Sequence, residues 1–126
     1  MKTRTYRYNS EWMPKGFLHD WDAHIYYIPE QIDVIERLRS MICTEFKNDE
    51  IFVGDIIPEP IGPHTLPMLE VNFSQAQYYK LVPWLDEYRE SLNILVHPQD
   101  GTDYDNHTAK ALWLGQPVRL KLEVFK

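Results

Sequence analysis

The chain has 126 residues, 13 of them basic and 19 acidic, and its formal net charge is −6 at pH 7. This length predicts one domain, residues 1–126, and the dispersed basic residues argue against a nucleic-acid partner, whose phosphates require clustered Lys and Arg. The single cysteine, Cys43, excludes disulfides within the chain and cysteine-based zinc motifs. No apolar run approaches the roughly 20 residues that span a bilayer, and the N-terminal residues lack the apolar core of a signal peptide. We therefore expect no membrane partner and a cytoplasmic location.

The first part of the chain predicts an irregular segment followed by a strand, a helix and a second strand. Residues 1–18 are aromatic but aperiodic, which indicates an irregular N-terminal segment. Residues 21–28 are rich in aromatic and β-favouring side chains and stop at a proline, as a strand would. Apolar residues at helical spacing predict a helix over residues 30–46, and residues 51–57 form the next strand.

The middle of the chain predicts two more strands with a helix between them. Residues 66–73 form the third strand, after a turn at Gly62-Pro63-His64. A capping-box pattern begins a helix at Ser74, and Pro83 should kink this helix or end it early. Residues 92–96 predict the fourth strand.

The C-terminal part predicts an appended helix over residues 105–114, with Gly115 at its end, and a half-buried strand over residues 118–124. The preceding order of strand–helix–strand–strand–helix–strand is the split βαβ, ferredoxin-like arrangement of an α+β protein. Two helices then cover one face of an antiparallel sheet, and the other face stays open for a ligand or a partner subunit. Because a bare sheet face exposes apolar surface, we expect a homodimer.

Alternation along the strands assigns the candidate site to that open face. The side chains expected there are Asp22, His24, Tyr26, Met68, Glu70, Asn72, Asn93, Leu95 and His97. The ferredoxin-like strand order places His24 between Glu70 on one flank and His97 on the other. Two histidines and a carboxylate are the ligand set of a non-haem Fe(II) site with open positions. His64, at the entry to the third strand, is a rival third ligand or a base, and His107 could fold back over the same face.

The same histidines also have structural interpretations, which spacing alone leaves open. A strand histidine such as His24 is often a hydrogen-bonded structural residue, and His64 and His97 could be turn residues beside prolines. His107 could bond into the first turn of a helix, and His19 belongs to a loop before the first strand. The metal interpretation depends on three separate segments placing ligands on one predicted face.

Six stretches carry a distinctive combination of residues. They are Trp21-Asp22-Ala23-His24-Ile25-Tyr26-Tyr27, Gly62-Pro63-His64, Leu69-Glu70-Val71-Asn72-Phe73, Val82-Pro83-Trp84-Leu85, Leu95-Val96-His97-Pro98, and Asp105-Asn106-His107-Thr108 leading into Ala111-Leu112-Trp113-Leu114-Gly115. In order and spacing they resemble the small DOPA 4,5-dioxygenase family of fungal and bacterial aromatic ring-cleaving enzymes, over about residues 20–122. Members of that family often carry a histidine two residues before the one matching His24, where this chain has Asp22.

The resemblance implies an oxidoreductase that cleaves a catechol, such as DOPA or a related hydroxylated aromatic, by extradiol chemistry with O2 and non-haem Fe(II). Another divalent ion such as zinc could occupy the site in a purified sample. The ligands it implies are His24, His97 and His64, with Glu70 as an alternative third ligand or a catalytic carboxylate. It implies His107 as the acid–base residue, because a catechol proton must be removed and later returned, and histidine titrates near the working pH. The side chains expected to line the substrate pocket are Tyr26, Asn72 and Asn93.

Two other functions remain compatible with the sequence. A dimeric ferredoxin-like module could bind a small aromatic ligand without catalysis, since the aromatic side chains would serve either task. A metal-dependent enzyme with another oxidative reaction would keep the metal but leave catechols intact. Bound metal would distinguish an enzyme from the binding module. Catechol turnover would distinguish a ring-cleaving dioxygenase from an enzyme with another oxidative reaction.

Overall fold

The computed structural model describes residues 19–125. Its centre is a five-stranded antiparallel sheet with the strand order β2-β3-β1-β4-β5. The strands are β1 (Trp21–Tyr26), β2 (Ile51–Ile57), β3 (Met68–Phe73), β4 (Asn93–Pro98) and β5 (Leu112–Leu114). The helical elements are η1 (Pro29–Gln31), α2 (Ile32–Glu45), α3 (Gln75–Tyr88), α4 (Asp103–Asn106) and η2 (Leu122–Phe125). This arrangement confirms the predicted α+β ferredoxin-like fold, while the irregular segment predicted for residues 1–18 lies outside the described residues.

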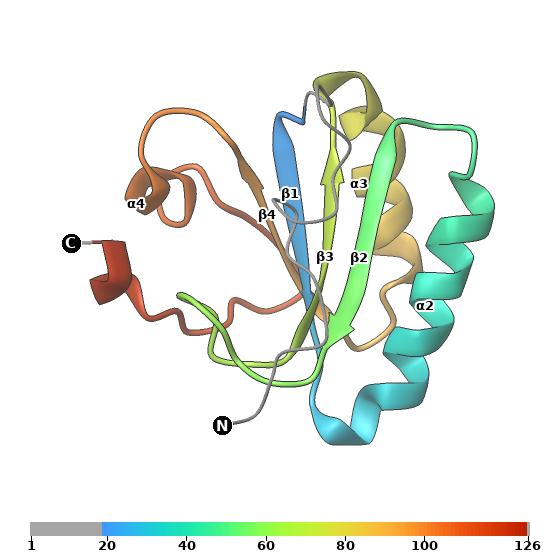
Figure 1. The fold of residues 1–126 in the computed structure, drawn as a ribbon, viewed down its shortest axis with the longest axis horizontal. Helices are drawn as coiled ribbons and strands as arrows, with labels where there is room; N and C mark the ends of the chain where they lie inside the picture. Colours follow the sequence, from blue (N-terminus) through green and yellow to red (C-terminus); the bar gives the residue numbers. More distant parts are fainter. Residues whose placement is uncertain (1–18, 126) are drawn as a thin grey trace.

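Helices α2 and α3 lie side by side on one face of the sheet (Figure 1). The apolar side chains of each helix lie along one stripe, and those of each strand lie on one face. These two sets pack against each other and form the main core. The buried members of this core include Ile35 and Leu38 of α2, Leu81 and Leu85 of α3, and Ile25 of β1. The predicted inward residues of β1, β3 and β4 all belong to this core, which confirms the assignment of faces.

Helix α3 continues for five residues past Pro83, so of the two expected effects of this proline, a kink or an early end, the early end is wrong. Pro83 lies on the exposed side of the helix, whereas Val82 and Leu85 are buried against the sheet. Packing of this apolar stripe holds the helix together on both sides of the proline, since most helical stability in proteins comes from tertiary contacts.

The C-terminal part differs from the predicted helix over residues 105–114 and strand over residues 118–124. Helix α4 has only one turn, and β5 pairs with β4 through Ile94↔Leu114 and Val96↔Leu112. The edge of β4 offers unpaired backbone groups, and pairing with them outweighs the helical tendency of this short stretch. Within the described residues, the chain beyond β5 forms one isolated bridge, His64↔Leu120, and η2 follows it.

The face opposite the two helices is covered by the chain itself. Figure 1 shows α4 and the C-terminal segment on this side of the sheet. A second core cluster forms there from Tyr26, Ile57, Met68 and Leu95, with side chains such as Trp113, Val118 and Leu120 packed against it. The prediction of an open face is therefore wrong, because residues after β4 fold back over it. The homodimer stays a prediction, without the support of a bare sheet face.

None of the helices within residues 19–125 has the length and apolar character needed to cross a membrane.

Candidate metal centre

Four histidines from four separate segments converge on the covered face of the sheet. His24 lies on β1, His97 on β4, His64 in the loop between β2 and β3, and His107 directly after α4. The ring centroids are 4.2 Å apart for His24 and His64, 5.0 Å for His24 and His97, and 4.2 Å for His97 and His107. All four side chains are buried, with exposed fractions between 2% and 9%. We call these four residues the histidine cluster.

The sheet register explains how His24 and His97 meet. In the antiparallel pair of β1 and β4, Asp22 lies opposite His97, and His24 lies two residues further along the same face. The two imidazoles therefore approach on the diagonal, and their Nε2 atoms are 3.0 Å apart. On the other flank, Glu70 of β3 lies directly opposite His24. The expectation that Glu70 and His97 flank His24 is thus met by the register and by the side-chain contacts.

Hydrogen bonds fix how His97 and His107 present their rings. Nδ1 of His97 is 2.9 Å from the carbonyl oxygen of Pro98, and Nδ1 of His107 is 2.7 Å from the carbonyl oxygen of Asp103. A carbonyl oxygen can only accept, so Nδ1 donates in both cases. The Nε2 atom of each neutral ring then carries the free lone pair.

His64 is held by the loop backbone and by a tyrosine. Its backbone N–H donates to the carbonyl of Ile61, and its Nδ1 is 2.7 Å from the hydroxyl of Tyr26. Burial raises the pKa of the Tyr26 hydroxyl, which therefore stays protonated and can either donate to or accept from Nδ1. Tyr26, expected to line the substrate pocket, is itself buried and contacts the cluster through His64.

Burial keeps the imidazoles of the cluster uncharged at neutral pH. Desolvation, together with the neighbouring imidazoles, lowers the pKa of His64 to about 3 and that of His97 to about 4. The pKa of His24 lies well below its usual value for the same reasons, and burial also lowers the pKa of His107. Neutral imidazole is the form that binds transition metals.

Two carboxylates border the cluster and share one amide. Glu70 Oε1 is 3.6 Å from Nδ1 of His24, and Asp22 Oδ2 is 3.9 Å from Nε2 of His97. The Nδ2 group of Asn72 donates to Asp22 at 2.5 Å and to Glu70 at 3.1 Å. Burial, reinforced by the charge of Glu70, raises the pKa of Asp22 to about 7. Asn72, expected to orient a substrate, lies fully buried between the two carboxylates.

The donor set of this centre suits a divalent transition metal. Two groups of residues have ligand atoms that all lie within 4.8 Å of one another: His24, His64 and His107, and Asp22, His24 and His97. His24 belongs to both groups. Neutral imidazole nitrogens with at most two carboxylates are typical of iron and zinc sites. Two nitrogens bound at right angles to one ion at roughly 2.1 Å are about 3 Å apart, a separation that His24 and His97 already have.

Asn93 lies at the far end of β4 from His97. It pairs with Tyr26 in the sheet register, and its side-chain carbonyl accepts the backbone N–H of Gln116 at 2.8 Å. Gly115 turns here with φ at +85°, and a Cβ at this residue would lie 2.5 Å from Asn93 Oδ1. Asn93 thus anchors the turn after β5, and its assignment to the substrate pocket stays a prediction.

Three contacts of the site have no counterpart in the sequence predictions. Gln99 donates to Asp22 from the loop after β4, the sulfur of Met68 is 3.2 Å from Nδ1 of His24, and the ring of Phe125 lies 4.7 Å from that of His107. Alternation placed Met68 on the correct face, but no pattern in the sequence indicated that Gln99 or Phe125 returns to it.

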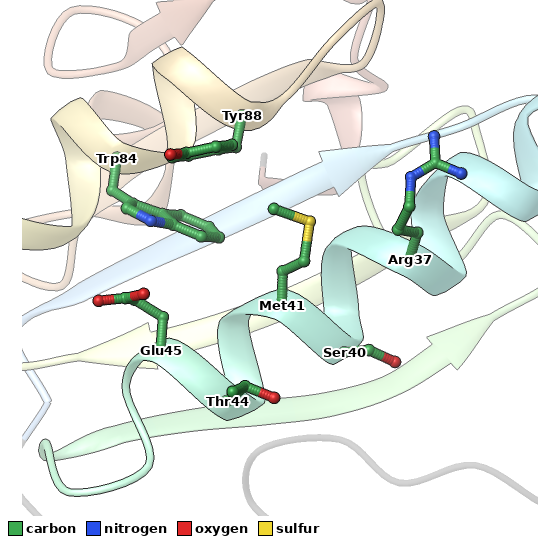
Figure 2. Close-up of a pocket in the computed structure, with 7 residues that line it drawn as sticks. All are labelled: Arg37, Ser40, Met41, Thr44, Glu45, Trp84 and Tyr88. Atoms are coloured by element: carbon green, nitrogen blue, oxygen red, sulfur yellow. The ribbon is translucent and has the colours of Figure 1, made fainter.

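A separate groove lies between α2 and α3 (Figure 2). It has a volume of about 360 Å³ and is lined by Arg37, Ser40, Met41, Thr44, Glu45, Trp84 and Tyr88. The rings of Trp84 and Tyr88 pack at 4.7 Å, and Arg37 forms an ion pair with Glu90 at 2.9 Å. No histidine lines this groove, so it lacks the imidazole ligands that the histidine cluster offers.

Comparisons with known proteins place the chain among dioxygenases. A family model described as the Dopa 4,5-dioxygenase family matches residues 21–124, a range that contains the whole histidine cluster. A protein of Botryotinia fuckeliana, named "Uncharacterized 21.2 kDa protein", is 34% identical over 137 aligned positions, which cover 100% of this chain and 74% of that protein. A crystal structure from Nostoc punctiforme, described as a "putative dioxygenase", is 36% identical with a TM-score of 0.78, and the match covers 85% of this chain and 90% of that chain.

Proposed function

Since this chain belongs to the Dopa 4,5-dioxygenase family, we propose that it opens the ring of a catechol with O2 by extradiol chemistry, using a bound Fe(II) ion. The observation that carries the proposal is the histidine cluster, in which four buried and uncharged imidazoles converge from four segments of the chain. Burying four polar rings together costs desolvation free energy. If their role were only structural, separate positions would be more favourable, because each ring could then bond to water or to the backbone.

We assign His24, His64 and His97 as the residues that would hold the metal ion. His24 comes first because it belongs to both groups of converging ligand atoms. His97 offers its Nε2 lone pair next to His24, and His64 offers the nitrogen that Tyr26 does not occupy. When bound, the ion would supply a Lewis acid with open positions for a catecholate and O2.

Glu70 then has an orienting role rather than a ligand's role. Its Oε1 faces Nδ1 of His24, the ring nitrogen on the side away from His97. A carboxylate that accepts the second N–H of a ligating histidine fixes the ring's tautomer and orientation. Asn72 in turn holds the other oxygen of Glu70.

His107 is the residue that we assign to proton transfer with the substrate. It is the most exposed of the four histidines, at 9%, and its Nδ1 bond to Asp103 leaves Nε2 to accept a proton. The lone pair at Nε2 suits removal of a catechol proton, and the resulting imidazolium can return a proton to the opened product. The neighbouring Asp103 favours this charged form, since it raises the pKa of His107 against the effect of burial.

Anaerobic reconstitution with Fe(II) tests this function directly. DOPA, caffeate or protocatechuate is then added together with O2, and both absorbance and oxygen uptake are recorded. We expect a yellow ring-opened product and matching oxygen uptake with Fe(II), and neither with the metal-free or the zinc-loaded protein. Tight iron binding without oxygen uptake on any catechol would contradict ring cleavage, and loss of aromatic binding on chelation would contradict the metal-free binding module.

A further inference from the structure

The histidine cluster is closed to a substrate in this structure. The four imidazoles expose between 2% and 9% of their surface, and catechol oxygens must reach the centre of the cluster to be bound there. Some part of the covering chain therefore has to move. The covering elements differ in how firmly they are attached, and this difference identifies the part that moves.

The C-terminal segment is firmly attached as far as Lys121. Leu120 forms a bridge with His64, and the backbone N–H of Lys121 donates to the carbonyl of Pro63 at 2.7 Å. The hydroxyl of Thr65 donates to the carbonyl of Arg119 at 2.5 Å. These bonds tie residues 119–121 to the loop that carries His64, so this part of the cover cannot leave without disturbing the cluster.

The last turn, η2, is attached much more weakly. None of its residues Leu122–Phe125 is buried, and the backbone N–H of Val124 donates to the carbonyl of Lys121 within the same turn. A single 3-10 turn has little stability of its own. Its contact with the cluster is the ring of Phe125, which lies 4.7 Å from the ring of His107 at an interplanar angle of 37°. Figure 1 shows η2, in red, next to α4 on the side of the sheet opposite α2.

We propose that Phe125 is the gate and a specificity-determining residue of this site. Residues 122–125 pivot at Lys121, the ring of Phe125 leaves His107, and the ring of a planar, monocyclic aromatic substrate takes its place against the imidazole. The proposal rests on the proposed function for the identity of the substrate, but the movement of the gate does not depend on turnover. The size of the substrate ring is set by the surface that Phe125 vacates, which is that of one six-membered aromatic ring.

Chemical labelling of His107 tests the gate without a metal ion and without a substrate. The metal-free protein is treated with diethylpyrocarbonate, which acylates neutral imidazoles, and the labelling rate of the peptide containing His107 is followed by mass spectrometry. We expect Phe125→Ala to speed labelling by roughly two- to tenfold, the range that one aromatic pair contributes, and Phe125→Trp to slow it. Val124→Ala is the matched control, because Val124 is the adjacent residue, is 50% exposed and should leave the rate unchanged.

Binding of 4-nitrocatechol to the Fe(II)-loaded protein without O2 tests the specificity. Phe125→Ala should bind this probe faster than the wild type does. It should also show a smaller preference for monocyclic catechols over 2,3-dihydroxynaphthalene. Its iron content should be unchanged. Equal labelling of His107 in wild type and Phe125→Ala overturns the gate, whatever the activity. Faster labelling in a protein that cleaves no catechol leaves the gate in place and overturns the proposed function instead. Faster labelling with an unchanged substrate preference overturns the assignment of Phe125 to specificity.

Discussion

The Nε2 atoms of His24 and His97 lie 3.0 Å apart, although the two residues are 73 positions apart in the chain. Because His97 uses its Nδ1–H on the carbonyl of Pro98, its Nε2 can only accept in the neutral state, so Nε2–H of His24 donates to it when no metal is bound. A metal ion between the two rings requires the lone pair of His24 Nε2. The proton must then move to Nδ1, which faces Glu70 at 3.6 Å. Under the proposed function, metal binding by this pair therefore requires a change of tautomer in His24.

Substitution of His24 should abolish metal binding and leave the fold intact. His24→Ala removes the residue that both groups of ligand atoms share, while the main core on the other face of the sheet is untouched. We expect metal content near background after reconstitution, with an unchanged far-UV circular dichroism spectrum. Tyr79→Ala is the control, since Tyr79 is 78% exposed and lies on α3, on the opposite face of the sheet from the histidine cluster. Normal iron content in His24→Ala would refute the ligand assignment.

Glu70 should control metal affinity without being a ligand. Glu70→Ala removes the carboxylate that would accept Nδ1–H of His24 in the metal-bound protein, and loss of such a partner typically lowers metal affinity about 10- to 100-fold. Glu70→Gln keeps an oxygen at this position, so its metal affinity should fall less than that of Glu70→Ala. Competition with a chromophoric chelator measures both affinities. If Glu70→Gln binds as little metal as His24→Ala does, the carboxylate is a direct ligand.

The stability of the metal-free protein should fall when the pH is lowered from about 6.5 towards 4. The pKa of His64 is lowered to about 3 and that of His97 to about 4, whereas unfolded histidines titrate near 6.5. In this window the unfolded chain binds more protons, so each of these histidines reduces the free energy of unfolding by about 1.4 kcal/mol per pH unit. Asp22 acts in the opposite direction, because its pKa is raised to about 7 and its protonated form is favoured in the folded state.

Urea unfolding with a chelator present, at pH 7.5, 6 and 5, measures this dependence. The histidines outnumber Asp22, so the net effect should be destabilisation by acid. A free energy of unfolding that stays constant or rises down to pH 5 would show that the histidines are charged or exposed in the folded protein.

The sheet and its faces were predictable from the sequence because strand alternation is a local property. Alternation alone puts His24, Glu70 and His97 on one face, and the ferredoxin-like strand order makes their strands neighbours. The observed register then brings the three side chains together as one site. The two helices were equally predictable, because each carries one apolar stripe.

The cover of the site was not predictable, because tertiary contacts determine it. Residues 112–114 are helical by local pattern, but they pair with the free edge of β4. His64 and His107 reach the cluster through loops whose paths no periodicity encodes. Phe125 lies beyond every recognised pattern, and only the chain's return across the sheet brings it to His107.

Removal of the Tyr26 hydroxyl should weaken both stability and metal binding. In Tyr26→Phe the ring still fills its place in the second core cluster, but Nδ1 of His64 loses its partner at 2.7 Å in a buried site. An unpaired buried polar group costs about 1–3 kcal/mol, so the free energy of unfolding should fall by that amount. Metal affinity should fall about 10- to 100-fold, because Tyr26 also fixes the orientation of His64.

Tyr27→Phe is a matched control for this variant. Tyr27 is the adjacent tyrosine, lies on the helix side of the sheet, and donates to the carbonyl of Ile57 at 3.3 Å. Loss of the Tyr27 hydroxyl should lower the free energy of unfolding by a smaller amount. Metal affinity should stay unchanged, because this hydroxyl bonds to Ile57 and not to a residue of the histidine cluster. Equal metal affinity in Tyr26→Phe and Tyr27→Phe would contradict the assignment of His64 as a ligand, and the third ligand would then have to be Asp22, Glu70 or His107.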